Sequence, residues 1–331
     1  MTIESLKKIW TGRQDREINS FRWHQKVSFE AVENYQHQPV LTGFACDEGV
    51  RRNQGRIGAK NGPQVIRSAL ANLTCAESFK FFDSGDIVCE GESLEQAQDK
   101  LAEHIVKILD KNGFPLVIGG GHEVAFGSFS AIQRFLERRQ SRQSRIGIIN
   151  FDAHFDLRDP ASGASSGTPF RQCQMLCESK SLDFQYCVLG VNPSSNTQAL
   201  FDFAREHQVR WLTDEMMHHL SNVEQTKYLM SFLEKCDYLY ITVCLDVFSS
   251  AFAPGVSAPA AVGIHPMQAL LWLKNIVALC REMSVTPVLC DIAEMNPAFD
   301  KDNQTAKLAA RIIYEFVELY KTLNFRTAGD S

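Results

Sequence analysis

The chain lacks long apolar runs and long basic blocks. No stretch of 18 apolar residues occurs, and the first residues lack the apolar core of a signal peptide, so we expect no membrane-spanning helix and no secretion. A net charge of -5 without a basic block argues against nucleic acid as a partner. These absences predict a cytoplasmic protein.

Closely paired cysteines are also missing. The ten cysteines are scattered singly, and no C-x-x-C pair occurs among them. Cys187, Cys244 and Cys290 lie inside apolar runs, where a cysteine behaves as a small hydrophobic residue. In a reducing compartment we therefore expect free thiols and not disulfides.

What the chain does contain is the pattern of an α/β protein. Its 331 residues, 44% of them apolar and 22% charged, are enough for a large core in one domain or in two smaller ones. From residue 40 onward, short apolar runs alternate with helical patterns, and no repeat or linker interrupts them. This rhythm predicts a mostly parallel sheet between layers of helices. We predict one catalytic domain at residues 41–331, with residues 1–40 as an N-terminal extension packed on its body.

The predicted strands lack polar alternation, which fits a sheet buried on both faces. They are Pro39–Phe44, Phe79–Asp83, Pro115–Gly119, Arg145–Phe151, Gln185–Val191, Val209–Leu212, Tyr238–Leu245 and Pro287–Ile292. The predicted helices show the longer period of an amphipathic segment. They are Gly62–Leu73, Ser93–Asn112, Val124–Arg139, Val223–Lys235, Pro266–Met283 and Asn303–Thr322.

The most informative segment follows the apolar run Ile146–Ile149. Asp152, His154 and Asp156 stand at i, i+2 and i+4, so they would share one face at the end of the predicted strand. Two carboxylates and an imidazole crowded there lose hydration and repel one another unless a cation lies among them. A divalent metal would supply that cation. The alternative is a solvated loop in which Asp156 caps a helix.

A second strand end carries a histidine. Pro115–Ile118 leads into three glycines, which permit a tight turn, and then into His122. The turn could also hold a phosphate, but it lacks the Lys-Ser/Thr pair of a P-loop.

Two further apolar runs end in acidic residues. Cys244 and Asp246 share a face at the end of Tyr238–Leu245, and Glu294 follows Pro287–Ile292. Each residue alone is more often a cap or a turn residue than a ligand. Ligands of open α/β sheets bind beyond the carboxyl ends of the strands. Because polar, ligand-type residues follow all four of these predicted strands, we expect them to form one site.

These segments resemble the signatures of the ureohydrolase family, which includes arginase and agmatinase. That family carries a Gly-Gly-x-His motif, an Asp-Ala-His-x-Asp motif and a Ser-x-Asp-x-Asp motif followed by a proline. The resemblance covers residues 40 to 325, roughly, and is greatest to the formimidoylglutamase group. The matching segments are Asp47–Val50, Gly55–Pro63, Gly119–Glu123, Asp152–Arg158, Ser166–Gln172 and Pro254–Ala260.

The resemblance implies an arginase-like three-layer α/β fold and two manganese ions in each subunit. It also implies hydrolysis of N-formimidoyl-L-glutamate, a small anionic amidine, to L-glutamate and formamide in histidine degradation. In that reaction a metal-bridging hydroxide attacks the amidine carbon. The resemblance is also compatible with a homo-oligomer.

By the same resemblance, the metal ligands are His122, Asp152, His154, Asp156 and Asp246. The spacing from Asp246 to the following proline places Cys244 where the family has a bridging aspartate. Three interpretations are open: Cys244 binds metal as a thiolate, it is a buried spectator beside a weak or partly filled centre, or the centre is lost. Carboxylates suit manganese, whereas a thiolate favours softer ions such as zinc, so manganese occupancy is open too.

Two catalytic roles also follow from the resemblance. Glu294 is expected to hold the cationic amidinium through charge-assisted hydrogen bonds, and Asp156 to relay a proton after the attack. The alternative for Glu294 is a surface residue in a capping turn.

The substrate's carboxylates suit planar arginine side chains. Arg56, Arg158 and Arg171 belong to segments of the predicted site, although an isolated arginine is usually a solvated surface charge. The resemblance places Asn192 near the substrate as well.

Two other functions remain open. One is a ureohydrolase that acts on a guanidino acid or on agmatine. Arg158 and Arg171 favour an anionic substrate over agmatine, and Thr168–Phe170 occupy the place of a histidine found in arginases. The other is a metal-poor, weakly active relative used for binding or regulation, which Cys244 supports.

Overall fold

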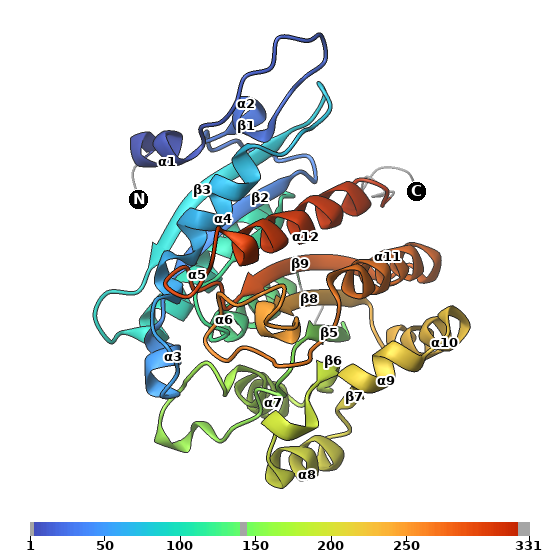
Figure 1. Cartoon of the computed structure of the whole chain (residues 1–331). Helices are drawn as coiled ribbons and strands as arrows, with labels where there is room; N and C mark the ends of the chain where they lie inside the picture. Colours follow the sequence, from blue (N-terminus) through green and yellow to red (C-terminus); the bar gives the residue numbers. More distant parts are fainter. Residues whose placement is uncertain (1–2, 140–143, 324–331) are drawn as a thin grey trace.

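A single sheet forms the middle of the molecule. The computed structural model describes residues 3–139 and 144–323, and within them nine strands pair in the order β1-β3-β2-β4-β9-β8-β5-β6-β7 (Figure 1). Every one of these pairings is parallel. The predicted α/β fold is confirmed, with a sheet that is wholly parallel in the described residues.

The strands are short and largely buried, as their apolar sequences predict. They are β1 (Val27–Ser28), β2 (Pro39–Ala45), β3 (Phe81–Val88), β4 (Phe114–Ile118), β5 (Ile146–Phe151), β6 (Gln185–Val191), β7 (Arg210–Thr213), β8 (Tyr238–Cys244) and β9 (Thr286–Ala293). The eight predicted strands all occur, and β1 is an addition to them.

The prediction for β3 ended too early. It stopped at Asp83, because Asp83 and Asp86 interrupt the apolar run, yet β3 continues to Val88. Both carboxylates accept hydrogen bonds from Arg67, which is fully buried (Asp83 Oδ2 at 2.7 Å, Asp86 Oδ1 at 2.6 Å). A buried charge is tolerated when it is paired in this way, and sequence alone does not show the pairing.

Helices cover both faces of the sheet. One apolar cluster packs α4 (Gly62–Ala71), α10 (Asn222–Leu233), α11 (Pro266–Met283) and α12 (Gln304–Tyr320) against one face. A second cluster packs α5 (Leu94–Asp110), α6 (Val124–Arg138), α7 (Pro169–Ser179) and α8 (Gln198–Glu206) against the other. The six predicted helices are confirmed.

The helices that the sequence patterns did not predict are mostly short. They are α1 (Ile3–Ile9), α2 (Trp23–Lys26), α3 (Glu48–Arg52), α7, α8 and α9 (Asp214–His219). No helix in the described part of the chain is long and apolar enough to cross a membrane.

The N-terminal segment packs on the edge of the sheet. Trp10 and Trp23 are buried in the first cluster, and β1 pairs with β3 at the sheet edge. Because β2 already begins at Pro39, the division of the chain at residue 40 stays a prediction.

Candidate metal centre

The predicted site residues follow four neighbouring strands. In the sheet order β4-β9-β8-β5 these strands are central, and their carboxyl ends lie at one edge because all are parallel. A pocket of about 330 Å³ opens there and is lined by His122, His154, Asp156, Cys244, Asp246 and Glu294, among others. A larger hollow of about 600 Å³ lies at the opposite strand ends, and none of the predicted site residues lines it.

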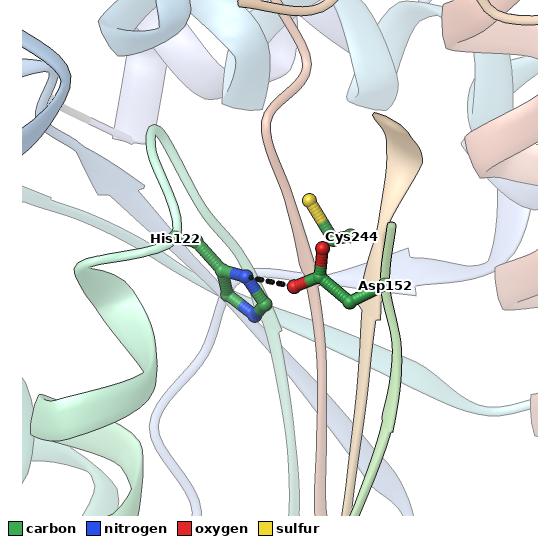
Figure 2. Close-up of side chains that lie close together, drawn as sticks. All are labelled: His122, Asp152 and Cys244. Carbon is green, nitrogen blue, oxygen red and sulfur yellow. Dashed lines mark ion pairs between the residues drawn. The ribbon is translucent and has the colours of Figure 1, made fainter. Parts of the chain in front are cut away.

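His122, Asp152 and Cys244 form one group of metal-type donors. Their donor atoms all lie within 4.8 Å of one another (Figure 2). The His122 Nδ1 atom is 2.9 Å from Asp152 Oδ2 and 2.9 Å from Asp156 Oδ2, yet this buried nitrogen has no hydrogen-bond partner. Close contacts without hydrogen-bond geometry are expected where donors converge on a cation.

A hydrogen bond below the pocket orients the His122 ring. Its Nε2 atom is 3.0 Å from Thr242 Oγ1. Deeper still, the buried carboxylate of Asp291 accepts hydrogen bonds from Ser128 and Tyr240. Because Nε2 is engaged by Thr242, Nδ1 is the ring nitrogen of His122 that faces the carboxylates. An imidazole oriented in this way is typical of a metal ligand.

Asp152, His154 and Asp246 form a second donor group. The His154 Nδ1 atom is 3.2 Å from Asp246 Oδ2 and 3.5 Å from Asp152 Oδ1. The other Asp246 oxygen, Oδ1, is buried and has no hydrogen-bond partner. Asp152 belongs to both groups, so the donors fit two neighbouring cations that share one carboxylate.

Burial makes this site electrostatically unfavourable without cations. Burial and the charge of Asp152 raise the pKa of Asp156 to about 6. Burial and Asp152 likewise raise the pKa of Asp246, and burial with Asp246 and Glu123 raises the pKa of Glu294 well above its ordinary value. A bound divalent ion would reverse these directions, because it favours the ionised ligands.

Two site residues have strained backbones. Asp156 has φ 50° and Glu294 has φ 71°, a left-handed conformation that is uncommon for residues other than glycine. Such strain costs about 1–3 kcal/mol for each residue and is concentrated at functional sites. Glu294 is held by two contacts to the glycine turn: its backbone N–H donates to Gly120 O at 2.8 Å, and its Oε1 accepts from His122 N–H at 3.0 Å.

The glycine turn requires glycine for a steric reason. A Cβ on Gly120 would lie 1.5 Å from the carbonyl oxygen of Cys46, which follows β2. The close passage of β2 therefore fixes the turn that presents His122.

The three predicted arginines lie in different environments. Arg158 lines the pocket, and its guanidinium has no carboxylate partner among the described residues. Arg56 also lines the pocket, but its guanidinium donates to the carbonyls of Val256 and Ser257 and lies over Phe299.

Arg171 and Asn192 lie outside the pocket lining. Arg171 is in α7, where it pairs with Asp159 at 3.3 Å and lies over Phe203. The Asn192 side chain accepts a hydrogen bond from Ser194 N–H at 2.9 Å. In its place Asn196 lines the pocket, where it accepts from Phe155 N–H at 3.0 Å.

Sequence reasoning also missed several polar pocket residues. Asn53, Ser166, Ser195 and Asn196 line the pocket. Ser166 could have been found, because it lies in the Ser/Gly loop, the stretch at residues 160–169 that is rich in serine, glycine and proline and closely follows Asp156. The others follow no pattern that marks them.

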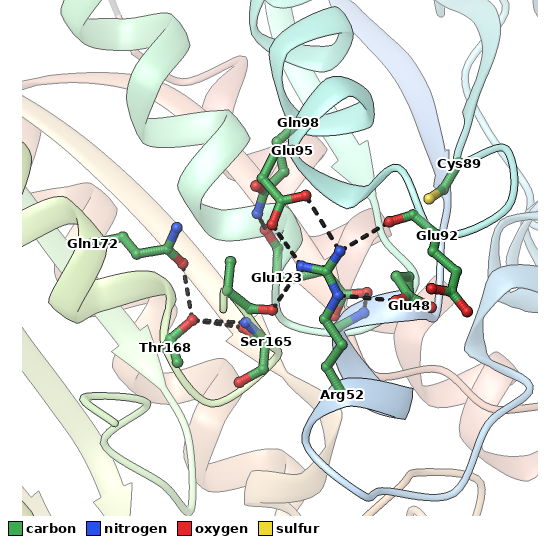
Figure 3. A network of polar contacts seen from close by, with 12 residues as sticks. Glu48, Arg52, Cys89, Glu92, Glu95, Gln98, Glu123, Ser165, Thr168 and Gln172 are labelled. Atoms are coloured by element: carbon green, nitrogen blue, oxygen red, sulfur yellow. Dashed lines mark hydrogen bonds and ion pairs between the residues drawn. The ribbon is translucent and has the colours of Figure 1, made fainter. Parts of the chain in front are cut away.

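A polar network fastens that loop to the body of the molecule (Figure 3). Arg52, at the end of α3, donates to Glu48, to Glu95 at the start of α5 and to the carbonyl of Ala164 in the loop. Thr168 Oγ1 accepts from Ser165 N–H at 2.9 Å. Arg52 thus ties the loop that carries Ser166 to α3 and α5, and the Thr168–Ser165 contact closes a turn within it.

Comparison with known proteins agrees with this geometry. Residues 37–318 match the model of the Arginase family. The chain belongs to the arginase family. It is 44% identical to the formimidoylglutamase of Ralstonia nicotianae over 96% of this chain and 97% of that protein. It is 42% identical to the formimidoylglutamase of Clostridium tetani over 94% of each chain.

Solved structures show the same fold. The structure of Trypanosoma cruzi formiminoglutamase with Mn2+2 has a TM-score of 0.74 and 28% identity, covering 89% of this chain and 97% of that one. The formimidoylglutamase of Bacillus subtilis superposes with a TM-score of 0.81 over 95% and 96% of the chains at 23% identity, a likeness of fold alone. The family resemblance and the fold predicted from sequence are confirmed, and membership of the family supports a binuclear metal site.

The Thr242 contact makes a prediction about metal affinity. Thr242→Val keeps the side-chain shape but removes the hydroxyl that is hydrogen-bonded to His122 Nε2, so the imidazole is no longer held in its orientation. We expect metal binding to weaken about 10–100-fold, measured by titrating metal into chelator-treated protein. Thr305→Val, which removes another buried hydroxyl that accepts from Gly255 N–H, serves as control. Equal affinities in Thr242→Val and the unmodified protein would contradict the role of Thr242.

Proposed function

We propose that the protein hydrolyses N-formimidoyl-L-glutamate to L-glutamate and formamide at this centre. The observation that carries the proposal is the composition of one pocket. The carboxylate of Glu294 and both donor groups lie together there, and the unpaired guanidinium of Arg158 lines the same pocket. An amidinium joined to two carboxylates has complementary charges at its two ends. The full-length similarity to formimidoylglutamases supports this substrate.

Manganese is the cation we propose for the centre. Asp152, Asp156 and Asp246 supply oxygen donors, which suit Mn2+, and His122 and His154 supply nitrogen donors. Two divalent ions at such a site make a water nucleophilic at neutral pH. Asp152 would be shared, with His122 and Asp156 on one side and His154 and Asp246 on the other.

The protein's own residues orient the substrate. Glu294 Oε2 is buried without a hydrogen-bond partner, so it is available to accept from the amidinium. Arg158 binds a carboxylate of the glutamate portion, with Asn53 and Ser166 beside it in the pocket lining. Asp156 lines the same pocket and is placed to carry a proton to the departing glutamate amine. Cleavage of the bond between the amidine carbon and the glutamate nitrogen leaves formamide.

A substrate panel tests the proposal directly. The purified protein with manganese is offered N-formimidoyl-L-glutamate, arginine, agmatine and a guanidino acid. We expect formamide and glutamate from the first and little turnover of the others, because Arg158 favours an anionic substrate. Release of urea from arginine, without any reaction of the formimidoyl compound, would overturn the assignment.

Glu294→Gln tests the amidinium contact. The change keeps the shape and an acceptor for His122 N–H but removes the charge. Loss of a charge-assisted hydrogen bond costs about 1.5–3 kcal/mol, so kcat/KM should fall roughly ten- to 150-fold with metal content unchanged. Glu315→Gln, in α12 and paired with Lys274 and Arg311, is the control. An unchanged kcat/KM would exclude the contact, and Asp291 could not replace it because it does not line the pocket and its carboxylate accepts from Ser128 and Tyr240 below it.

Arg158 and Arg171 form a matched pair for the carboxylate contact. Arg158→Met removes charged hydrogen bonds to the substrate, which should weaken substrate binding by about 1.5–3 kcal/mol. KM should therefore rise. Arg171→Met should leave kcat/KM within about twofold, since its guanidinium lies outside the pocket and an exposed ion pair contributes little. Steady-state kinetics at saturating manganese give both values. The reverse order of effects would move the carboxylate site to α7.

A further inference from the structure

The surroundings of Cys244 differ from those of the other buried cysteines. Eight cysteines are buried, and seven of them pack inside the two large apolar clusters. Cys244 belongs to none of the apolar clusters, although its exposure is only 1%. A cysteine that served only as a small hydrophobic residue would be expected among apolar neighbours.

The neighbours of Cys244 are instead the groups of the metal centre. The residue lines the pocket together with His122, Asp156, Asp246 and Glu294. Its sulfur lies within 4.8 Å of the donor atoms of both His122 and Asp152, and the three side chains reach into the same space (Figure 2).

The position of the sulfur is fixed by the sheet. Cys244 is the last residue of β8, which is paired on one side with β5 and on the other with β9. Cys244 itself is in register with Ala293, and the central strand cannot rotate a side chain to its other face without losing that register. The buried Nδ1 atom of His122, which has no partner with hydrogen-bond geometry, belongs to the same group of donor atoms as the sulfur.

We infer that Cys244 is a thiolate ligand of the ion on the His122 side, and that this side consequently prefers a softer divalent ion than the His154 side does. The inference rests on the metal centre of the proposed function. The His122 side then offers nitrogen, oxygen and sulfur, whereas the His154 side offers only nitrogen and oxygen. Thiolate ligands favour ions such as Zn2+ or Co2+ over Mn2+. The thiol proton is released to solvent when the ion binds.

Cobalt provides a direct probe of the sulfur. Chelator-treated, full-length protein is titrated with Co2+ alone, and the near-ultraviolet spectrum is followed for sulfur-to-cobalt charge transfer. We expect the band in the unmodified protein and its loss in Cys244→Ala. The matched control is Cys290→Ala, which removes an equally buried thiol that packs in the apolar cluster on the neighbouring strand β9; it should keep the band. A band that persists in Cys244→Ala, or cobalt bound to the unmodified protein without a band, would overturn the inference.

Competition between Zn2+ and Mn2+ tests the preference. Cys244→Asp restores an oxygen donor, so the ratio of zinc affinity to manganese affinity should fall by about tenfold or more relative to the unmodified protein. An unchanged ratio would refute the predicted preference. Circular dichroism of each variant shows whether it is folded, and the cobalt band of Cys290→Ala guards against a general effect of removing a thiol.

These readouts are independent of turnover. If the cobalt band depends on Cys244 but N-formimidoyl-L-glutamate is not hydrolysed, the proposed function fails and the sulfur ligand stands. If hydrolysis occurs and the band is absent, the function stands and the inference about Cys244 fails.

Discussion

Buried negative charge at the centre of the sheet is the constraint on which the site depends. Asp152 is fully buried, and Asp246 and Glu294 are only 4% exposed. They follow three adjacent strands of one parallel sheet, whose ladders fix where each strand ends. These carboxylates therefore cannot reach solvent. In the low dielectric of the protein interior, their mutual repulsion destabilises the fold unless cations lie among them. The strained backbones of Asp156 and Glu294 are compatible with the same frame, because the surrounding strands and the glycine turn hold them.

Residues remote from the pocket keep this charged edge in place. The carbonyl of Cys46 abuts Gly120 and sets the turn that presents His122. Beneath the pocket, a second buried carboxylate, that of Asp291, accepts hydrogen bonds from the hydroxyls of Ser128 and Tyr240. Asp152 and Asp291 are thus both buried, but only Asp152 belongs to the groups of metal-type donors.

The sheet was predictable because its strands are apolar runs, whereas several site contacts were not. Apolar runs ending in polar residues located β4, β5, β8 and β9 and the residues that follow them. The direction in which a helical side chain points cannot be judged from how close it lies to a motif in the sequence. Arg171 lies close to the Ser/Gly loop in sequence, but α7 turns its side chain toward Asp159 and Phe203. Asn192 was predicted near the substrate and Asn196 was not considered. The short helix η3 (Pro193–Ser195) separates the two, and it is Asn196 that lines the pocket. Cysteines at positions 173 and 177, which form part of the buried face of α7, concealed that helix from an analysis of apolar periodicity.

Formal charge connects the sulfur to substrate recognition. With Cys244 bound as a thiolate, the ligand side chains Asp152, Asp156, Asp246 and Cys244 would carry four negative charges, and the attacking hydroxide a fifth, against the four positive charges of two divalent ions. With a neutral thiol, the three aspartates and the hydroxide would balance the two ions. In either state the charge of Glu294 would be left unmatched within the pocket, and the thiolate would add to the excess. A cationic amidinium would then be attracted by the carboxylate that the metal centre does not need, so the donor at position 244 would bear on the substrate as well as on the choice of metal.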